Sequence, residues 1–148
     1  MQQQDFRFST PLRVRWAEVD PQSIVFNGHY LAYADVGITE YFRELRAANP
    51  DTDIIGNDFF AVRTVLDYQA SAVFDDVLDI HVRIARLGNS SLQFLIGIYR
   101  QQELLVRGEI TYVQADMTTR KPKPLNPAFR TLVQDFEVTA PVDARTPS

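Results

Sequence analysis

The chain has 148 residues, a length typical of one domain, and 45% of them are apolar, which is enough for a sizeable core. A net charge of −4 argues against a nucleic-acid partner, and the absence of cysteine excludes disulfides, thiolate metal ligands and a cysteine nucleophile. The first residues show no signal-peptide pattern, and the longest apolar run, Phe94 to Tyr99, is far shorter than the roughly 20 residues of a membrane helix. We therefore expect a cytoplasmic protein without nucleic-acid or membrane partners.

The first half of the chain predicts one strand and one long helix. Apolar and polar residues alternate from Phe6 to Trp16, and this strand-like run stops at Asp20-Pro21. A long helix is expected from His29 to Ala47, because its apolar residues recur every three or four positions. Gly37 lies in the middle of this helix, where glycine costs about 1 kcal/mol relative to alanine. Its presence indicates that a packing partner approaches the helix closely.

The second half predicts four strands and a short helix, after a polar loop from Asp51 to Asp58. The strands share an alternating pattern and are expected at residues 60–68, 78–84, 92–100 and 104–116. Their short spacing favours an antiparallel meander. The last helix is expected from Pro127 with Asn126 as its cap, followed by a loose tail from about Val138. With no repeat or linker, residues 1–148 are predicted to form one α+β domain, in which the long helix packs on a curled antiparallel sheet.

Asp20 stands at the end of the strand-like run and close to the expected start of the long helix. A helix start offers unpaired backbone N–H groups and a partial positive charge. A carboxylate beside such donors suits the hydrolysis of an acyl bond, because one group attacks or activates water while the others stabilise the oxyanion. From its own sequence context, Asp20 could equally end a strand or begin a turn, since Asp-Pro pairs favour turns.

From Asp20 to Tyr30 the sequence reads Asp-Pro-Gln-Ser-Ile-Val-Phe-Asn-Gly-His-Tyr. In this setting the chain resembles the hot-dog-fold acyl-CoA thioesterases of the 4-hydroxybenzoyl-CoA thioesterase type, over about Phe6 to Leu125, with Ser23 where glycine is usual. The resemblance implies a hot-dog fold, with a long central helix wrapped by a curved antiparallel sheet of about five strands. It also implies hydrolysis of acyl-CoA, with CoA as part of the substrate and no separate cofactor. A homo-oligomer, either a dimer or a dimer-of-dimers tetramer, would cover the sheet edge.

The same resemblance implies Asp20 and Asn27 as the catalytic residues. Asp20 would act as a nucleophile that forms an acyl anhydride or as a general base on water, and both roles stay open. Asn27 would position water or the thioester carbonyl, or would only cap the helix. Glu18 would share a strand face with Asp20, or would pair with a nearby arginine.

Further residues are candidates for substrate contact. Those at the helix start and in the acyl pocket are Phe26, Gly28, His29, Tyr30 and Phe60, although core packing explains the aromatic ones equally well. Those expected at the phosphates of CoA are Ser90, Ser91, Arg120, Lys121 and Lys123, with a solvated surface as the alternative.

Three other kinds of site find less support in the sequence. Only two histidines exist, without metal-ligand spacing, so no metal site is expected, and His81 is predicted to be exposed. The His-Phe-Pro type of motif of a hot-dog dehydratase is absent, as is the Gly-x-Ser-x-Gly motif of an α/β-hydrolase. A non-catalytic acyl-CoA or acyl-carrier-binding module remains as the alternative function.

Overall fold

The computed structural model describes residues 1–50, 55–56 and 58–145. The strands are β1 (Phe8–Arg13), β2 (Phe59–Tyr68), β3 (Val77–Leu87), β4 (Ser91–Arg100), β5 (Glu103–Gln114) and β6 (Val142–Asp143). The helices are α1 (His29–Ala48) and α2 (Pro127–Phe136), with single 3-10 turns η1 (Gln3–Asp5) and η2 (Trp16–Glu18). The polar loop predicted from Asp51 to Asp58 falls largely outside the described residues.

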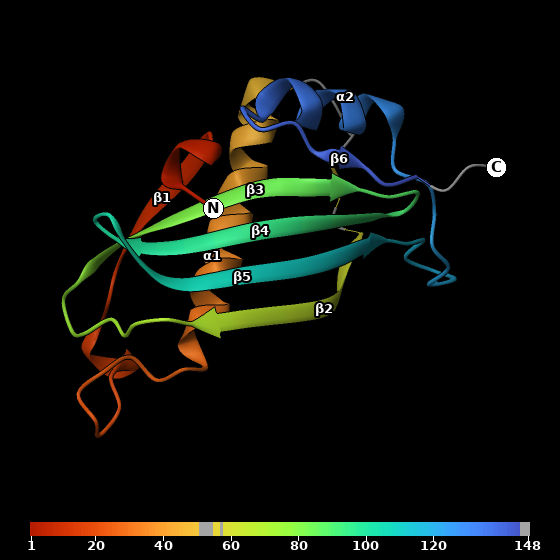
Figure 1. Cartoon of the computed structure of the whole chain (residues 1–148). Coiled ribbons are helices and arrows are strands. Elements are labelled where there is room, and N and C mark those ends of the chain that lie inside the picture. Colours follow the sequence, from red (N-terminus) through yellow and green to blue (C-terminus); the bar gives the residue numbers. More distant parts are fainter. Residues whose placement is uncertain (51–54, 57, 146–148) are drawn as a thin grey trace.

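All the strands form one sheet with the order β1-β3-β4-β5-β2, and β6 pairs in parallel with the end of β3 (Figure 1). The other pairings are antiparallel. The predicted meander is confirmed for β3, β4 and β5. It is wrong for β2, which lies at the far edge beside β5 and is separated from β3 by two strands. The crossing segment is residues 69–76, long enough to pass the end of the sheet.

Helix α1 crosses one face of the sheet and is covered by it along its apolar stripe (Figure 1). The alternating residues of β3, namely Leu78, Ile80, Val82 and Ile84, are fully buried beneath it, as predicted. A Cβ atom on Gly37 would lie 2.5 Å from Cγ2 of Ile80, which confirms that close packing excludes a side chain there. Among the described residues, neither helix is long and apolar enough to cross a membrane.

The predicted strand faces fail at two places. Strand β1 ends at Arg13, and η2 follows, so Glu18 does not lie in an extended strand beside Asp20. In β2 the register shifts between Ala61 and Arg63. Val62 is the extra residue of this bulge. The alternation of side chains between the two sheet faces is therefore interrupted at Val62, and residues before it lie on the opposite face from the one predicted.

Within residues 138–145, where the sequence predicted a loose tail, several groups contact the rest of the domain. Helix α2 begins as predicted, with the Asn126 side chain accepting a 2.8 Å hydrogen bond from the Ala128 N–H. Beyond it, the Thr139 hydroxyl donates to the carbonyl of Asp5 at 2.9 Å. The segment then pairs with β3 through β6.

Candidate active site

Asp20 lies in a tight loop that is closed by backbone hydrogen bonds. Its N–H donates to the Ile24 carbonyl at 2.9 Å, and its own carbonyl accepts from the Ser23 N–H at 2.9 Å. One carboxylate oxygen accepts from the Gln22 N–H at 2.8 Å. Among the described residues, the Asp20 side chain forms no ion pair. The Asp20 carboxylate is therefore half-buried in the loop, and it keeps acceptor capacity beyond the bond from Gln22.

Glu18 lies at the base of this loop, where its carbonyl accepts a hydrogen bond from the Phe26 N–H. Its side chain is 9% exposed and binds Arg15, with 2.8 Å to the backbone nitrogen and 3.1 Å to the guanidinium. Burial alone would raise the pKa of Glu18, but the hydrogen bonds from Arg15 outweigh it and hold that pKa below its usual range. The predicted pairing of Glu18 with a nearby arginine is thereby confirmed.

The start of α1 differs from the prediction. The N-cap position is Gly28, and no side chain caps the helix, so Asn27 is not the capping residue. The N–H groups of His29 and Tyr30 donate to the carbonyls of Phe26 and Asn27, at 2.9 and 3.3 Å. Within the described residues, the N–H groups of Asn27 and Gly28 have no such backbone acceptor. Both residues are exposed, so these two N–H groups lie at the surface of the helix start.

The remaining candidates at the helix start play different parts. The Phe26 ring is half exposed and lies over Gly28, where a Cβ atom would come within 2.8 Å of the ring. His29 is half-buried, with its ring centroid 5.9 Å from that of Phe26. Tyr30 is buried, and its hydroxyl accepts a 2.9 Å hydrogen bond from the Ala72 N–H, so it supports the site from within the core.

An apolar pocket of about 420 Å³ opens beside Gly28, between α1 and the strands β2 and β5. Its lining residues are Gly28, Leu31, Ala32, Asp35, Ala61, Thr64, Ile110 and Tyr112. Phe60 is not among them. Phe60 pairs with Val113, on the sheet face opposite to the pocket, and the guanidinium carbon of Arg120 lies 5.2 Å from its ring centroid.

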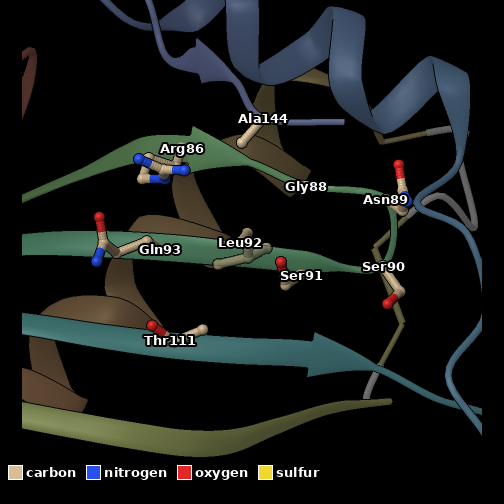
Figure 2. A pocket seen from close by; sticks show the side chains of 9 residues that line it. All are labelled: Arg86, Gly88, Asn89, Ser90, Ser91, Leu92, Gln93, Thr111 and Ala144. Atoms are coloured by element: carbon tan, nitrogen blue, oxygen red, sulfur yellow. The ribbon is translucent and has the colours of Figure 1, made fainter. Parts of the chain in front are cut away.

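A second, polar pocket of about 360 Å³ lies at the β3–β4 turn (Figure 2). The predicted residues Ser90 and Ser91 both line it, together with Arg86, Gln93 and Thr111. The guanidinium of Arg86 is exposed and forms no ion pair with a described residue. Such a mixture of a cation, hydroxyls and an amide suits a phosphate-bearing ligand.

The basic run is divided between two roles. The Lys123 ammonium lies 2.6 Å from the carboxylate of Asp58, which is 9% exposed and also accepts from the Gln114 amide at 3.2 Å. Burial would raise the pKa of Asp58, but the bonds from Lys123 and Gln114 lower it overall. Lys121 is exposed and forms no ion pair with a described residue.

Asp58 and Gln114 were not anticipated as site residues. Gln114 follows Ile110 and Tyr112 at intervals of two, so an inward polar residue at a strand end was the available signal. Asp58 offered no such signal, because it lies in a segment whose polarity suggested only a loop.

Backbone hydrogen bonds connect the basic run to the β3–β4 turn through Gln114. The Lys123 N–H donates to the Gln114 carbonyl at 3.0 Å, and the Gln114 N–H donates to the Ser90 carbonyl at 2.7 Å. The basic run and the β3–β4 turn are therefore neighbours.

Within one chain the candidates form two separate groups. The loop before α1 and the β3–β4 turn lie at opposite ends of the sheet (Figure 1). Strand β2 spans the distance between them. At its last residue, the Tyr68 hydroxyl donates to the Asn27 carbonyl at 3.3 Å, whereas Phe60, near its first residue, lies under Arg120.

His81 is half-buried between aromatic rings rather than exposed as predicted. Its ring centroid lies 5.4 Å from that of Phe6 and 5.0 Å from that of Tyr99, and burial lowers its pKa. The N-terminal segment covers this part of the sheet, which the alternating pattern of β3 could not reveal. In the described part of the chain, no cluster of three or more histidine or acidic side chains is arranged to hold a metal ion.

Comparisons with known proteins show which family the chain belongs to. A family model described as the thioesterase superfamily matches residues 22–114. The acyl-CoA thioesterase YbgC of Haemophilus influenzae is 26% identical over 119 residues, which cover 80% of this chain and 88% of that protein. The acyl-CoA thioester hydrolase YbgC of Escherichia coli is 26% identical over 131 residues, or 88% of this chain and 96% of that protein.

Solved structures extend the likeness to three dimensions. A thioesterase from Thermus thermophilus, solved in complex with coenzyme A and zinc, superposes with a TM-score of 0.78 at 26% identity, covering 90% of this chain and 96% of that one. The expected hot-dog fold is thereby confirmed. Because the family model matches more than half of its residues, the chain is an enzyme that belongs to the thioesterase superfamily.

Proposed function

We propose that the protein hydrolyses acyl-CoA thioesters, releasing a carboxylic acid and CoA. The observation that carries this proposal is the Asp20 carboxylate, which forms no ion pair with a described residue and stands on the closed loop that leads into the uncapped start of α1. The free N–H groups of Asn27 and Gly28 would hold the thioester oxygen as it gains negative charge. The named activities of the two YbgC relatives support acyl-CoA as the substrate class.

Asp20 can act in two ways. As a nucleophile, its carboxylate oxygen forms a bond to the thioester carbon, the C–S bond breaks, and the CoA thiolate leaves and takes up a proton. Water then hydrolyses the acyl anhydride and regenerates the carboxylate. As a general base, Asp20 accepts a proton from water as the water oxygen attacks the same carbon, the C–S bond then breaks, and the departing CoA thiolate takes up the proton. In both routes the acyl group would occupy the apolar pocket beside Gly28.

The nucleotide end of CoA would bind at the other group of residues. Ser90 and Ser91 offer hydroxyls in the polar pocket, and Arg120 and Lys121 add exposed positive charge nearby. Lys123 is held by Asp58, so its contribution to the phosphates would be through charge at the pocket rim rather than as a free donor. The substrate-binding residues therefore divide into an acyl end and a phosphate end.

These two ends would meet in a homodimer. Strand β2 is an open edge of 10 residues, with Val62 61% exposed. Antiparallel pairing of β2 with that of a second copy, across a two-fold axis, places the Tyr68 end of one strand beside the Phe59 end of the other. The Asp20 loop of one subunit would then face the phosphate-binding residues of its partner, and the open edge would be covered.

Thiol release from acyl-CoA tests the proposed activity. A panel of short, long and aromatic acyl-CoAs is incubated with the protein, and free CoA is measured with a thiol-reactive dye. Saturable release from at least one acyl class supports the proposal, and turnover of none of them would exclude it. Sedimentation tests the assembly, since an active monomer at micromolar concentration would contradict a site shared between subunits.

A further inference from the structure

Every backbone carbonyl of the β3–β4 turn accepts a hydrogen bond from a different segment of the chain. The pairs are Leu87 O with Ala144 N at 2.8 Å, Gly88 O with Arg130 Nη1 at 2.6 Å, Asn89 O with Leu125 N at 2.9 Å, and Ser90 O with Gln114 N at 2.7 Å. One of these donors is a side chain, the guanidinium of Arg130. Because each carbonyl of the turn is held, its backbone has one conformation, which fixes the direction in which each side chain leaves the turn.

Arg130 is an unusual residue to find in this place. It belongs to α2 but is only 7% exposed, and its second nitrogen lies 3.2 Å from the Asp143 carboxylate in β6. Burying a guanidinium is unfavourable unless it is paired and hydrogen-bonded. Here the compensating partners are the turn carbonyl of Gly88 and the carboxylate of Asp143, so Arg130 joins the turn to the C-terminal segment, residues 126–145.

The C-terminal segment also forms part of the polar pocket itself. Ala144 lines that pocket with Ser90 and Ser91, and it lies beside the end of β3 (Figure 2). Strand β6 pairs with Arg86 and Leu87, directly before the turn. The match to the family model ends at residue 114, so Arg130, β6 and Ala144 lie beyond the matched region.

We propose that the C-terminal segment acts in substrate binding, with Arg130 and Asp143 as positioning residues that hold Ser90 and Ser91 toward the nucleotide end of CoA. This inference rests on the proposed function, which places that end of the substrate in the polar pocket. Arg130 fixes the turn through the Gly88 carbonyl, and Asp143 orients Arg130. Neither residue touches the reacting thioester.

The proposal has a specific kinetic consequence. A contact remote from the thioester contributes the same binding free energy in the ground state and in the transition state. Its loss therefore raises KM and leaves kcat unchanged. The effect is confined to substrates that carry the nucleotide. A residue that only stabilises the fold would instead alter acyl-CoA and a truncated acyl-pantetheine alike.

The test compares Arg130→Met and Asp143→Asn with the parent protein on both substrates. The control is Arg43→Met, which removes an arginine that pairs with Glu40 on the exposed side of α1. We expect KM for acyl-CoA to rise about 5- to 10-fold in Arg130→Met and about 3-fold in Asp143→Asn, as for the loss of one hydrogen bond. The kcat values and KM for acyl-pantetheine should stay within about twofold of the parent in all three variants.

A double variant, Ser90→Ala with Ser91→Ala, separates this inference from the proposed function. If that double variant raises KM for acyl-CoA and Arg130→Met and Asp143→Asn do not, the positioning role is wrong while the binding pocket stands. If the double variant itself leaves KM unchanged, CoA binds elsewhere, and the phosphate pocket and the positioning role both fall, while thiol release from acyl-CoA still decides the proposed activity. Equal losses on acyl-pantetheine would also overturn the inference. Should Arg130→Met not fold, Asp143→Asn, whose side chain is partly exposed, decides the matter alone.

Discussion

The N–H of Phe26 donates to the carbonyl of Glu18 across 3.0 Å, and this bond closes the loop that carries Asp20. Within the closed loop, Ser23 adopts a φ of 64°, in the left-handed region that favours glycine. Glycine, which the resemblance led us to expect at this position, would adopt this φ without strain. The backbone of Ser23 is therefore strained in this loop conformation.

Ser23→Gly should therefore stabilise the protein. Relief of about 1–2 kcal/mol of left-handed strain is partly offset by the greater freedom of glycine in the unfolded chain, so we expect a gain of about 0.5–1 kcal/mol. The measurement is the urea midpoint. Ser9→Gly, on strand β1, is the matched control and should lose stability. A loss of similar size in Ser23→Gly would contradict the role assigned to φ.

Asn27→Ala should leave stability within about 0.5 kcal/mol of the parent, because the Asn27 side chain does not cap α1. Its matched control is Asn126→Ala, which removes the cap of α2 and should cost about 1 kcal/mol. Thermal unfolding measures both. If the backbone N–H groups alone hold the oxyanion, kcat of Asn27→Ala should stay near the parent value. A large fall in kcat in the folded variant would make the amide itself catalytic.

Lysines 121 and 123 should respond differently to neutralisation. Lys123→Gln leaves the buried carboxylate of Asp58 without its ion pair, so we expect a stability loss of about 1–3 kcal/mol. Neutralising Lys121 with Arg120 should keep stability and raise KM for acyl-CoA about twofold at low salt, with the effect screened at high salt. Unfolding curves and KM at two ionic strengths measure these outcomes. A stable Lys123→Gln variant with raised KM would instead place Lys123 on the substrate.

Glu137 should make stability depend on pH. One of its carboxylate oxygens accepts from the Tyr41 hydroxyl at 2.6 Å and the Ile84 N–H at 2.8 Å, and the other is buried without a partner among the described residues. Burial raises the pKa of Glu137 above its unfolded value, so the folded state binds the proton more tightly. Its contribution is complete below the unfolded pKa and is lost as pH rises through the folded pKa.

The comparison of parent and Glu137→Gln isolates this effect, because glutamine does not titrate. On going from about pH 7.5 to about pH 5.5, the Tm of the parent should rise relative to that of Glu137→Gln. Other groups titrate alike in both proteins and cancel in the difference. A difference in Tm that is constant over this range, or that moves the other way, would show that Glu137 is ionised in the folded state.

Much of the fold could be predicted because its signals are local. The spacing of apolar residues along α1, the alternation in β3, and the Asn126-Pro127 start of α2 all reappear in the structure. The bulge at Val62 and the turn η2 could not be predicted, because they depend on pairing and packing with distant segments. That limit also explains why Phe60 was expected in the acyl pocket but lies on the opposite face.

The site residues divide in the same way. Asp20 and Gly28 were predicted from one contiguous motif, in which their spacing can be read directly from the sequence. The ion pair between Lys123 and Asp58, and the contact of Arg130 with Gly88, join residues 42 or more positions apart. Nothing in the local pattern could indicate such pairs.

The most direct test of the account is kcat for Asp20→Asn, beside the matched control Asp135→Asn on the exposed surface of α2. Asparagine preserves the size of the side chain and removes both its basicity and its nucleophilicity, so kcat for acyl-CoA should fall by at least ~100-fold while the control keeps the parent rate. Unfolding curves that match the parent would show that the loss is chemical. A folded Asp20→Asn variant with near-parent kcat on every thioester that the protein hydrolyses would contradict the central claim.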